Sequence, residues 1–342
     1  MLAKTAKKQS EKYSYHLGNV ALQTTINNFA LRKAKQNLRK TTIIAYDLSD
    51  IAKESAKKME NLSAVFDGSK RKVTQGFTLH GVGINNILTR LEVHDADTKT
   101  LNQVRRKIVK DVSEKLNQKG IWVFDRGNDH KEFFKDLRHN LKVNFICRLK
   151  RNRQVVVVKT GEIIKVENLP EGKHEIFLMN TQNTKIDFRA TFTLIIHKHL
   201  NEKDAIRLIS SLNIEKYTAD QFVTMYLERW GVENIFKRVK TKFKLEKIRV
   251  LQYQRFLNLV SLIQFAVIVS TLTFNKVQQS TNSLITGILM LYKNFIKLKS
   301  LTFNLDSFIS FMKKSLQPLV FRQHLTQPTL FSKRQMKKMG II

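Results

Sequence analysis

The chain has very few cysteine, proline and tryptophan residues: one, three and two, respectively, among 342. A single thiol, Cys147, excludes an internal disulfide framework and fits a reducing compartment such as the cytoplasm. It also argues against a zinc site, because the histidines show no metal-ligand spacing around it. Since no apolar stretch follows the first basic residues, we expect no secretory signal.

Acidic side chains are scarce as well. The chain has 28 of them against 61 lysines and arginines, and its formal net charge is +33. An excess of this size predicts a polyanionic partner, whose binding would weaken with salt because neutralised phosphates release counterions. The basic residues are dispersed rather than gathered beside an apolar span, so a membrane surface is the less favoured partner.

Long apolar runs are almost absent, and only residues 256–274 approach the roughly 20 residues that a membrane-spanning helix needs. Six polar residues interrupt this run: Asn258, Ser261, Gln264, Ser270, Thr271 and Thr273. We therefore expect a helix buried beneath a sheet and no membrane contact.

The pattern of apolar residues and turn signals predicts an α/β protein. The expected elements are a strand at 41–48, a hairpin of 76–84 and 87–94 around Asn85-Asn86, a helix at 100–118, a strand at 121–124 and a helix at 131–140. This order indicates a ribonuclease-H-like core, a mixed sheet flanked by helices. Its central strands would hold Asp47 and Asp125 side by side at one end of the sheet.

Composition and expected secondary structure divide the chain into five expected segments. They are a basic helical N-terminal arm (1–40), the first part of the core (41–142), a β-rich insertion (143–200), the second part of the core with a glutamate helix (201–250), and a helical C-terminal region with a basic tail (251–342).

Four polar residues, Tyr226, Arg229, Glu233 and Lys240, follow the spacing Y-x2-R-x3-E-x6-K. On a helix they would lie on one face, at 100° per residue. A carboxylate flanked by two cations and a phenol suits a metal ion and a phosphodiester. The alternative is an amphipathic surface helix in which Glu233 pairs with Lys237.

This motif resembles the Y-R-E-K signature of bacterial insertion-sequence DDE transposases, the group usually called the IS-four family. Residues 42–53, with Asp47, resemble its first-aspartate block, and residues 121–129, with Asp125, resemble its second. The resemblance implies a DNA transposase that cleaves transposon ends and transfers strands into target DNA. It also implies double-stranded DNA as partner, a dimer on DNA, and a place on the bacterial nucleoid in the cytoplasm.

Cleavage of this kind needs hard cations at the scissile phosphate, and carboxylates suit Mg²⁺. Asp47, Asp125 and Glu233 are the predicted catalytic residues and ligands of two Mg²⁺ ions, which Mn²⁺ can replace. We hypothesise that Asp125 bridges both ions. Two local rivals remain open: Asp50, which could instead cap a helix beginning at Ile51, and Asp129.

The resemblance assigns Tyr226, Arg229 and Lys240 to phosphates near the cleaved end, which suits a phenol, a guanidinium fork and an ammonium. Further DNA-contact candidates are Lys237, Arg126, Arg148 and Arg151. Arg148 and Arg151 could equally be charged residues that prevent a solvent-exposed edge strand from pairing with another chain. Family members also flip a base against a tryptophan of the insertion. Both tryptophans here, Trp122 and Trp230, lie elsewhere, so Phe188 or Phe192 would have to replace it.

Only 46 residues precede Asp47, whereas family members usually carry a longer N-terminal DNA-binding domain. A second hypothesis follows: a catalytically defective, truncated transposase that acts only as a DNA-binding or inhibitory partner. A third is another nuclease with the ribonuclease H fold, because fold alone does not fix function.

Overall fold

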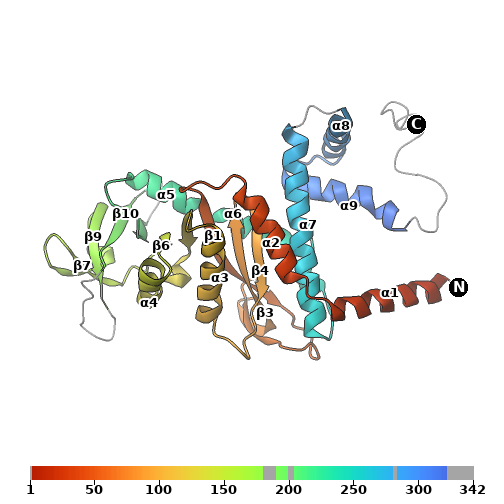
Figure 1. Cartoon of the computed structure of the whole chain (residues 1–342), viewed down its shortest axis with the longest axis horizontal. Coiled ribbons are helices and arrows are strands. Elements are labelled where there is room, and N and C mark those ends of the chain that lie inside the picture. Colours follow the sequence, from red (N-terminus) through yellow and green to blue (C-terminus); the bar gives the residue numbers. More distant parts are fainter. Residues whose placement is uncertain (1, 180–189, 199–203, 280–282, 322–342) are drawn as a thin grey trace.

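The computed structural model describes residues 2–179, 190–198, 204–279 and 283–321, which form an elongated molecule with a sheet at one end and helices at the other (Figure 1). The strands are β1 (Ile43–Ala52), β2 (Ser63–Asp67), β3 (Lys72–Ile84), β4 (Ile87–Val93), β5 (Ile121–Phe124), β6 (Asn144–Arg148), β7 (Gln154–Val157), β8 (Ile163–Lys165), β9 (Gly172–Leu178), β10 (Phe192–His197) and β11 (Ile206–Ser210). The α-helices are α1 (Leu2–Asn19), α2 (Gln23–Lys35), α3 (Leu101–Lys115), α4 (Lys131–Lys135), α5 (Ala219–Leu227), α6 (Trp230–Thr241), α7 (Tyr253–Gln279), α8 (Ser283–Leu298) and α9 (Leu305–Phe321).

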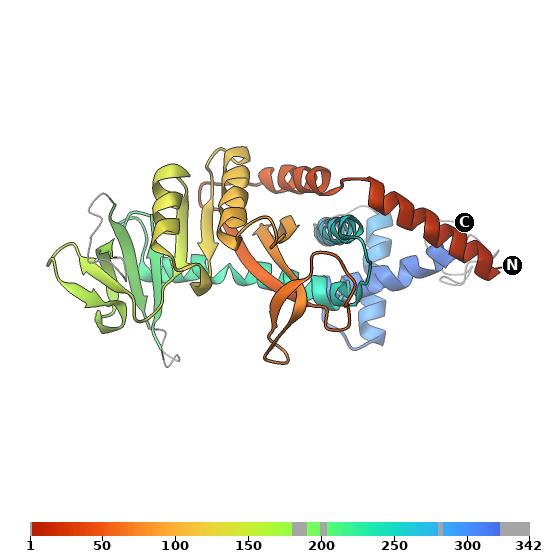
Figure 2. The ribbon, with the colours of Figure 1, turned by 90° about the horizontal axis from the view of Figure 1, so that it is seen from below.

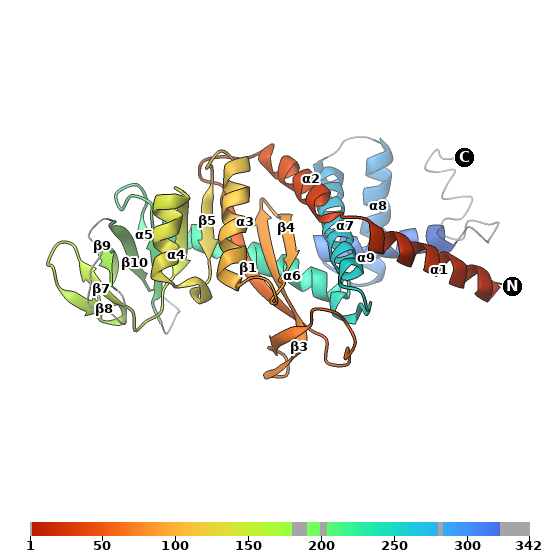
Figure 3. The same cartoon turned by 60° about the horizontal axis from the view of Figure 1, so that its bottom comes forward.

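Five strands build the centre of the sheet in the order β4-β3-β1-β5-β6. Strand β3 is antiparallel to both β4 and β1, whereas β5 lies parallel to β1 and β6 lies parallel to β5. Helices α3 and α4 cover one face and α6 the other (Figures 2 and 3). This is the ribonuclease-H-like arrangement, and the predicted fold class is confirmed.

Local sequence signals account for several of these elements. The hairpin of β3 and β4 turns at Asn85 and Asn86, whose φ angles of 50° and 63° are what a two-residue turn of type I′ requires. Helix α3 begins at a capping box of Thr100 and Gln103. Gly120, with φ of 99°, then turns the chain into β5.

Strand β6 was expected to open the β-rich insertion, but it pairs in parallel with β5, with Val123 opposite Ile146. It therefore completes the central sheet. Strand β11 adds to β6 in antiparallel fashion, and β10, β9, β7 and β8 extend the same sheet outward. We propose that the insertion begins after β6, and the division of the chain into five segments stays a prediction.

The N-terminal segment is helical, as expected, but it is more than an arm. The inner face of α2 is buried at Ile26, Ala30 and Leu31, and the helix packs on β4 and α7. Helix α7 is long and apolar enough to cross a membrane, yet half of its most apolar window is buried. Because Phe256 and Val267 on α7 belong to the core against β3 and β4, its contacts are those of the predicted core helix.

Helix α6 packs tightly against Gly81 of β3, where an added Cβ would lie 2.4 Å from Phe236 Cζ. We expect Gly81→Ala to destabilise the fold by about 1–3 kcal/mol, because the extra methyl group overpacks this contact. Gly83→Ala, on the same strand, is the control, since its Cβ would meet Val232 at an ordinary 3.4 Å. Equal midpoints of the two variants in chemical denaturation would contradict this account.

Three buried polar side chains, Tyr46, His80 and His94, lie in a row and contact one another. The Tyr46 hydroxyl lies 2.7 Å from His80 Nδ1, and His80 Nε2 lies 3.3 Å from His94 Nδ1. Burial, with smaller contributions from His94 and Arg105, lowers the pKa of His80 from 6.5 to about 3. The His80 ring is therefore neutral in the folded protein.

This depressed pKa predicts a loss of stability in acid. The unfolded chain takes up a proton at position 80 below about pH 6.5, whereas the folded chain does so only near pH 3. The stability contributed by His80 is thus complete above pH 6.5 and falls by up to about 1.4 kcal/mol per pH unit below it. In urea denaturation experiments between pH 4 and 7, His80→Gln should show a shallower pH dependence of stability than the unchanged protein. Parallel curves for the two proteins would refute the prediction.

Candidate active site

Asp47 lies within β1 and points to the face that α6 covers. Neighbouring Tyr46 belongs to the core on the α3 side and Ala45 to the core on the α6 side, so strand alternation puts Asp47 with Ala45. Its side chain is only 15% exposed. One carboxylate oxygen, Oδ1, accepts a hydrogen bond of 3.0 Å from the amide of Leu48.

Asp125 directly follows β5 and lies level with Asp47. In the parallel pairing of β1 with β5, Ala45 is opposite Val123, and each aspartate comes two residues later. The Oδ1 atom of Asp125 accepts a hydrogen bond from the side-chain amide of Asn128. The sequence placed the two aspartates side by side, and the strand register puts them at the same height in the sheet.

Arg229 connects the strand to the glutamate helix. It immediately precedes α6 and is 8% exposed, and its Nη1 atom lies 3.6 Å from Asp47 Oδ2 and 2.5 Å from Glu233 Oε1. The surface-helix alternative paired Glu233 with Lys237. The structure instead pairs Glu233 with Arg229, one turn earlier, and brings this pair to Asp47.

The charges of the three carboxylates act on one another. Burial raises the pKa of Asp47 from 3.8 to about 7, and the negative charges of Asp125 and Glu233 add to the rise. Arg229 opposes this shift without cancelling it. Arg229 therefore does not neutralise the negative charge of all three carboxylates, an arrangement that suits an additional cation.

The donor chemistry fits Mg²⁺, which prefers carboxylate oxygens together with water and phosphate. However, within the described residues, no three Asp, Glu, His or Cys side chains lie close enough together to hold a metal ion. The three predicted carboxylates meet in one region, with Arg229 between Asp47 and Glu233. They do not form a ready-made ligand cluster.

The two rival aspartates are engaged elsewhere. No helix begins at Ile51, because β1 continues to Ala52, so the expected helix cap at Asp50 is wrong. Asp50 instead accepts hydrogen bonds from Thr78 Oγ1 at 2.6 Å and from the Phe66 amide at 3.2 Å. Asp129 is buried and lies 2.6 Å from Arg153 Nη2. These contacts give both residues structural roles and favour Asp47 and Asp125 as the reactive pair.

A protein-family model described as "Transposase DDE domain" matches residues 38–269, more than half of the chain. The chain belongs to the transposase DDE domain family. The match includes β1, β5 and α6, and so all three carboxylates. The family is one of enzymes that generally use divalent metal ions.

This transposase domain is similar to several solved structures, among them the two that follow. A piggyBac transposase synaptic complex with hairpin DNA matches at 14% identity with a TM-score of 0.46, and the match covers 91% of this chain but only 59% of that chain. Argonaute of Marinitoga piezophila, in complex with guide RNA and target DNA, matches at 14% identity with a TM-score of 0.24, over 56% of this chain and 26% of that one. No curated protein sequence gives a match.

Two of the predicted DNA-contact residues of the transposase domain contact other side chains of the protein. Tyr226 is buried, and the Arg229 guanidinium lies 5.6 Å from the centre of its ring. Lys240 is partly exposed, and its Nζ lies 4.0 Å from Glu246 Oε1. The predicted single helix is also broken, because α5 ends at Leu227 and α6 begins at Trp230. The four residues of the motif therefore lie on two helices and the turn between them.

The other candidates differ in exposure. Lys237 and Arg126 are exposed, whereas Arg148 is partly buried at the end of β6, near enough to lower the pKa of Tyr226, which burial raises. Arg151 lies within 3.8 Å of Glu167 and 3.5 Å of Asp204, at the start of the outer strands. Lys237, Arg126 and Arg148 are therefore the better placed to meet DNA.

The aromatic residue available for stacking on a base differs from the one that was expected. Phe192 is 2% exposed within the core, which excludes it as a stacking surface for a base, and Phe188 lies outside the described residues. Trp122 lies in the core, and its Nε1 donates a hydrogen bond to Ser113 Oγ. Trp230, in contrast, is 56% exposed beside Arg229. Its position inside the Y-R-E-K spacing was the signal that could have identified it.

Proposed function

We propose that this protein is a DNA transposase of the IS-four type, which cleaves phosphodiester bonds at transposon ends and transfers the strands into target DNA. Asp47, Asp125 and Glu233 are the proposed catalytic residues and would hold two Mg²⁺ or Mn²⁺ ions. The observation that carries the proposal is that Arg229 contacts both Asp47 and Glu233, while Asp125 lies level with Asp47 on the neighbouring strand and burial raises the pKa of Asp47. Neighbouring carboxylates repel one another, and a divalent cation bound between them would relieve this repulsion.

Bound divalent ions would activate the attacking oxygen and stabilise the leaving oxygen of the scissile phosphodiester. The protein's own contribution begins with Arg229, whose Nη1 is shared by two carboxylates while its Nε is buried and finds no hydrogen-bond partner among the described residues. A phosphate oxygen would satisfy this donor and strengthen the guanidinium's charge interactions. Tyr226 packs against the guanidinium and limits its movement.

DNA would approach over the exposed cations near the carboxylates, Lys237 and Arg126, together with Arg148. Lys240 would reach a phosphate after leaving Glu246, and the exposed ring of Trp230 offers a stacking surface for a base. The net charge of +33 would attract the protein to DNA phosphates irrespective of base sequence. We further propose that the protein acts as a dimer on DNA, in the nucleoid of a bacterial cytoplasm.

The test begins with the DNA on both sides of the coding region, which should carry terminal inverted repeats. A labelled duplex with these ends, incubated with protein and Mg²⁺, should be nicked at the repeat boundary and not in EDTA. A duplex of scrambled sequence is the control. If the protein binds the end duplex but never cleaves it in Mg²⁺ or Mn²⁺, the proposal is wrong.

A second candidate is a catalytically inactive copy that only binds DNA or inhibits an intact transposase. The lack of a ready three-ligand group among the described residues favours it. Such a protein would bind the end duplex with the same salt dependence yet produce no nick, and it would reduce cleavage by an active relative when mixed with it.

A further inference from the structure

Two buried residues, Asn128 and Arg105, form a hydrogen-bonded line behind Asp125 that the sequence did not reveal. The side-chain amide of Asn128 donates to Asp125 Oδ1, and its oxygen accepts from Arg105 Nη1. Asn128 is 3% exposed and Arg105 is 7% exposed. Asp125 and these two residues come from the end of β5, from the short helix at Arg126–Asn128, and from α3.

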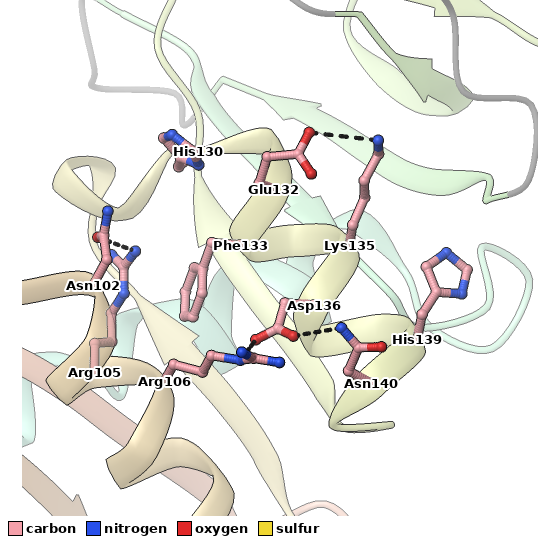
Figure 4. Close-up of a pocket in the computed structure, with 10 residues that line it drawn as sticks. All are labelled: Asn102, Arg105, Arg106, His130, Glu132, Phe133, Lys135, Asp136, His139 and Asn140. Carbon is pink, nitrogen blue, oxygen red and sulfur yellow. Dashed lines mark hydrogen bonds and ion pairs between the residues drawn. The ribbon is translucent and has the colours of Figure 1, made fainter.

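Arg105 is fixed on several sides. Its other terminal nitrogen, Nη2, donates to Asn102 Oδ1 at 2.8 Å, and its guanidinium carbon lies 3.8 Å from the centre of the Phe133 ring. Figure 4 shows Arg105 between Asn102 and Phe133, at the wall of a cavity of about 790 Å³ between α3 and α4. These contacts hold the Arg105 guanidinium in one place, and with it the side chain of Asn128.

The direction of the line is set by chemistry. A guanidinium only donates hydrogen bonds, so Asn128 must turn its oxygen to Arg105 and its NH₂ group to Asp125. That NH₂ group occupies Oδ1 and leaves Oδ2 of the same carboxylate available. Gly127 contributes space, because an added Cβ would lie 3.2 Å from Asp125 Oδ2. The Asp125 side chain is thus held in one orientation.

We infer that Arg105 and Asn128 are positioning residues that orient the Asp125 carboxylate for a divalent cation. The inference rests on the proposed function, since it assigns Asp125 as a ligand. Residues that hold a ligand from behind commonly change metal affinity by about 10–100-fold when removed. A purely structural role for Asn128 would change stability and leave the metal affinity of the folded protein unaltered.

The experiment measures Mn²⁺ binding by electron paramagnetic resonance, with folded protein at a temperature well below unfolding. We expect Asn128→Ala to weaken Mn²⁺ binding by about 10–100-fold. Asn102→Ala is the matched control, because it removes an acceptor from the same guanidinium without touching Asp125, and its Mn²⁺ affinity should match the unchanged protein. Arg105→Lys provides a second variant that keeps the charge but not the fork, and it should also weaken binding.

The outcomes separate the two proposals. Equal Mn²⁺ affinity of Asn128→Ala, Asn102→Ala and the unchanged protein would overturn the positioning role and leave the proposed function standing. If Asn128→Ala does not fold, Arg105→Lys decides in the same way. An unchanged protein that binds no Mn²⁺, with or without end DNA, would overturn the proposed metal-dependent function and the positioning role with it.

Discussion

Asp125→Ala is expected to lose at least about 10³-fold in the rate of DNA cleavage while binding the end duplex as tightly as the unchanged protein. Asp125 lies at the end of β5, level with Asp47, and its charge raises the pKa of that neighbour. Removing this carboxylate takes away a proposed ligand of both cations. DNA affinity should persist because it comes from dispersed lysines and arginines rather than from an acidic group.

The measurement pairs single-turnover cleavage with binding by fluorescence anisotropy on the same duplex. Asp50→Asn is the matched control for position, since Asp50 lies on β1 only three residues from Asp47 but hydrogen-bonds to Thr78 and Phe66. It should cleave within a few-fold of the unchanged protein. Cleavage that survives Asp125→Ala, or that disappears equally in Asp50→Asn, would remove Asp125 from the catalytic set.

The parts of this fold that the sequence predicted are those governed by neighbouring residues. The Asn85-Asn86 turn and the helix expected at 100–118 each depend on nearby side chains, and both are observed. The level placement of Asp47 and Asp125 also followed from sequence, because strand order implied that β1 and β5 are parallel neighbours. Local chemistry plus one topological inference therefore located two of the three carboxylates.

The parts that sequence reasoning missed depend on contacts between distant segments. Whether residues 144–148 open an insertion or complete the core is decided by pairing with β5, which no local pattern encodes. Asp50 resembled a helix cap, but antiparallel pairing with β3 extends β1 past it. The Arg105–Asn128 line joins residues 23 positions apart, and the spacing of charged residues gives no sign of it.

The role of Arg229 shows the same limit at the site itself. The Y-R-E-K spacing predicted a phosphate contact, and helical periodicity placed Arg229 beside Glu233, which is observed. That the same guanidinium also reaches Asp47 depends on how α6 packs over β1 and β3, at the Gly81–Phe236 contact. An arginine that joins Asp47 to Glu233 before a substrate arrives is a feature that only the packed structure reveals.

Asp47→Asn is expected to stabilise the metal-free protein, although it should abolish cleavage. The folded-state pKa of Asp47 is raised from 3.8 to about 7, so the folded chain keeps a proton there that the unfolded chain has already released. Stability linked to Asp47 is therefore complete below about pH 4 and is lost as the pH rises to 7. Above pH 7 the loss amounts to roughly 4 kcal/mol, at about 1.4 kcal/mol per pKa unit.

An asparagine at position 47 has no charge to bury, so it avoids this loss. The gain is reduced because Arg229 keeps only Glu233 as a close partner, and we expect about 2–4 kcal/mol at pH 8 and almost none at pH 4. Urea denaturation in EDTA at both pH values measures it, with Asp50→Asn as the control on the same strand. At pH 8, Mg²⁺ should then raise the melting temperature of the unchanged protein and not that of Asp47→Asn, because the cation neutralises the same buried charge. A difference between the two proteins that is as large at pH 4 as at pH 8 would show that the gain comes from packing, and Asp47 would no longer mark a cation site.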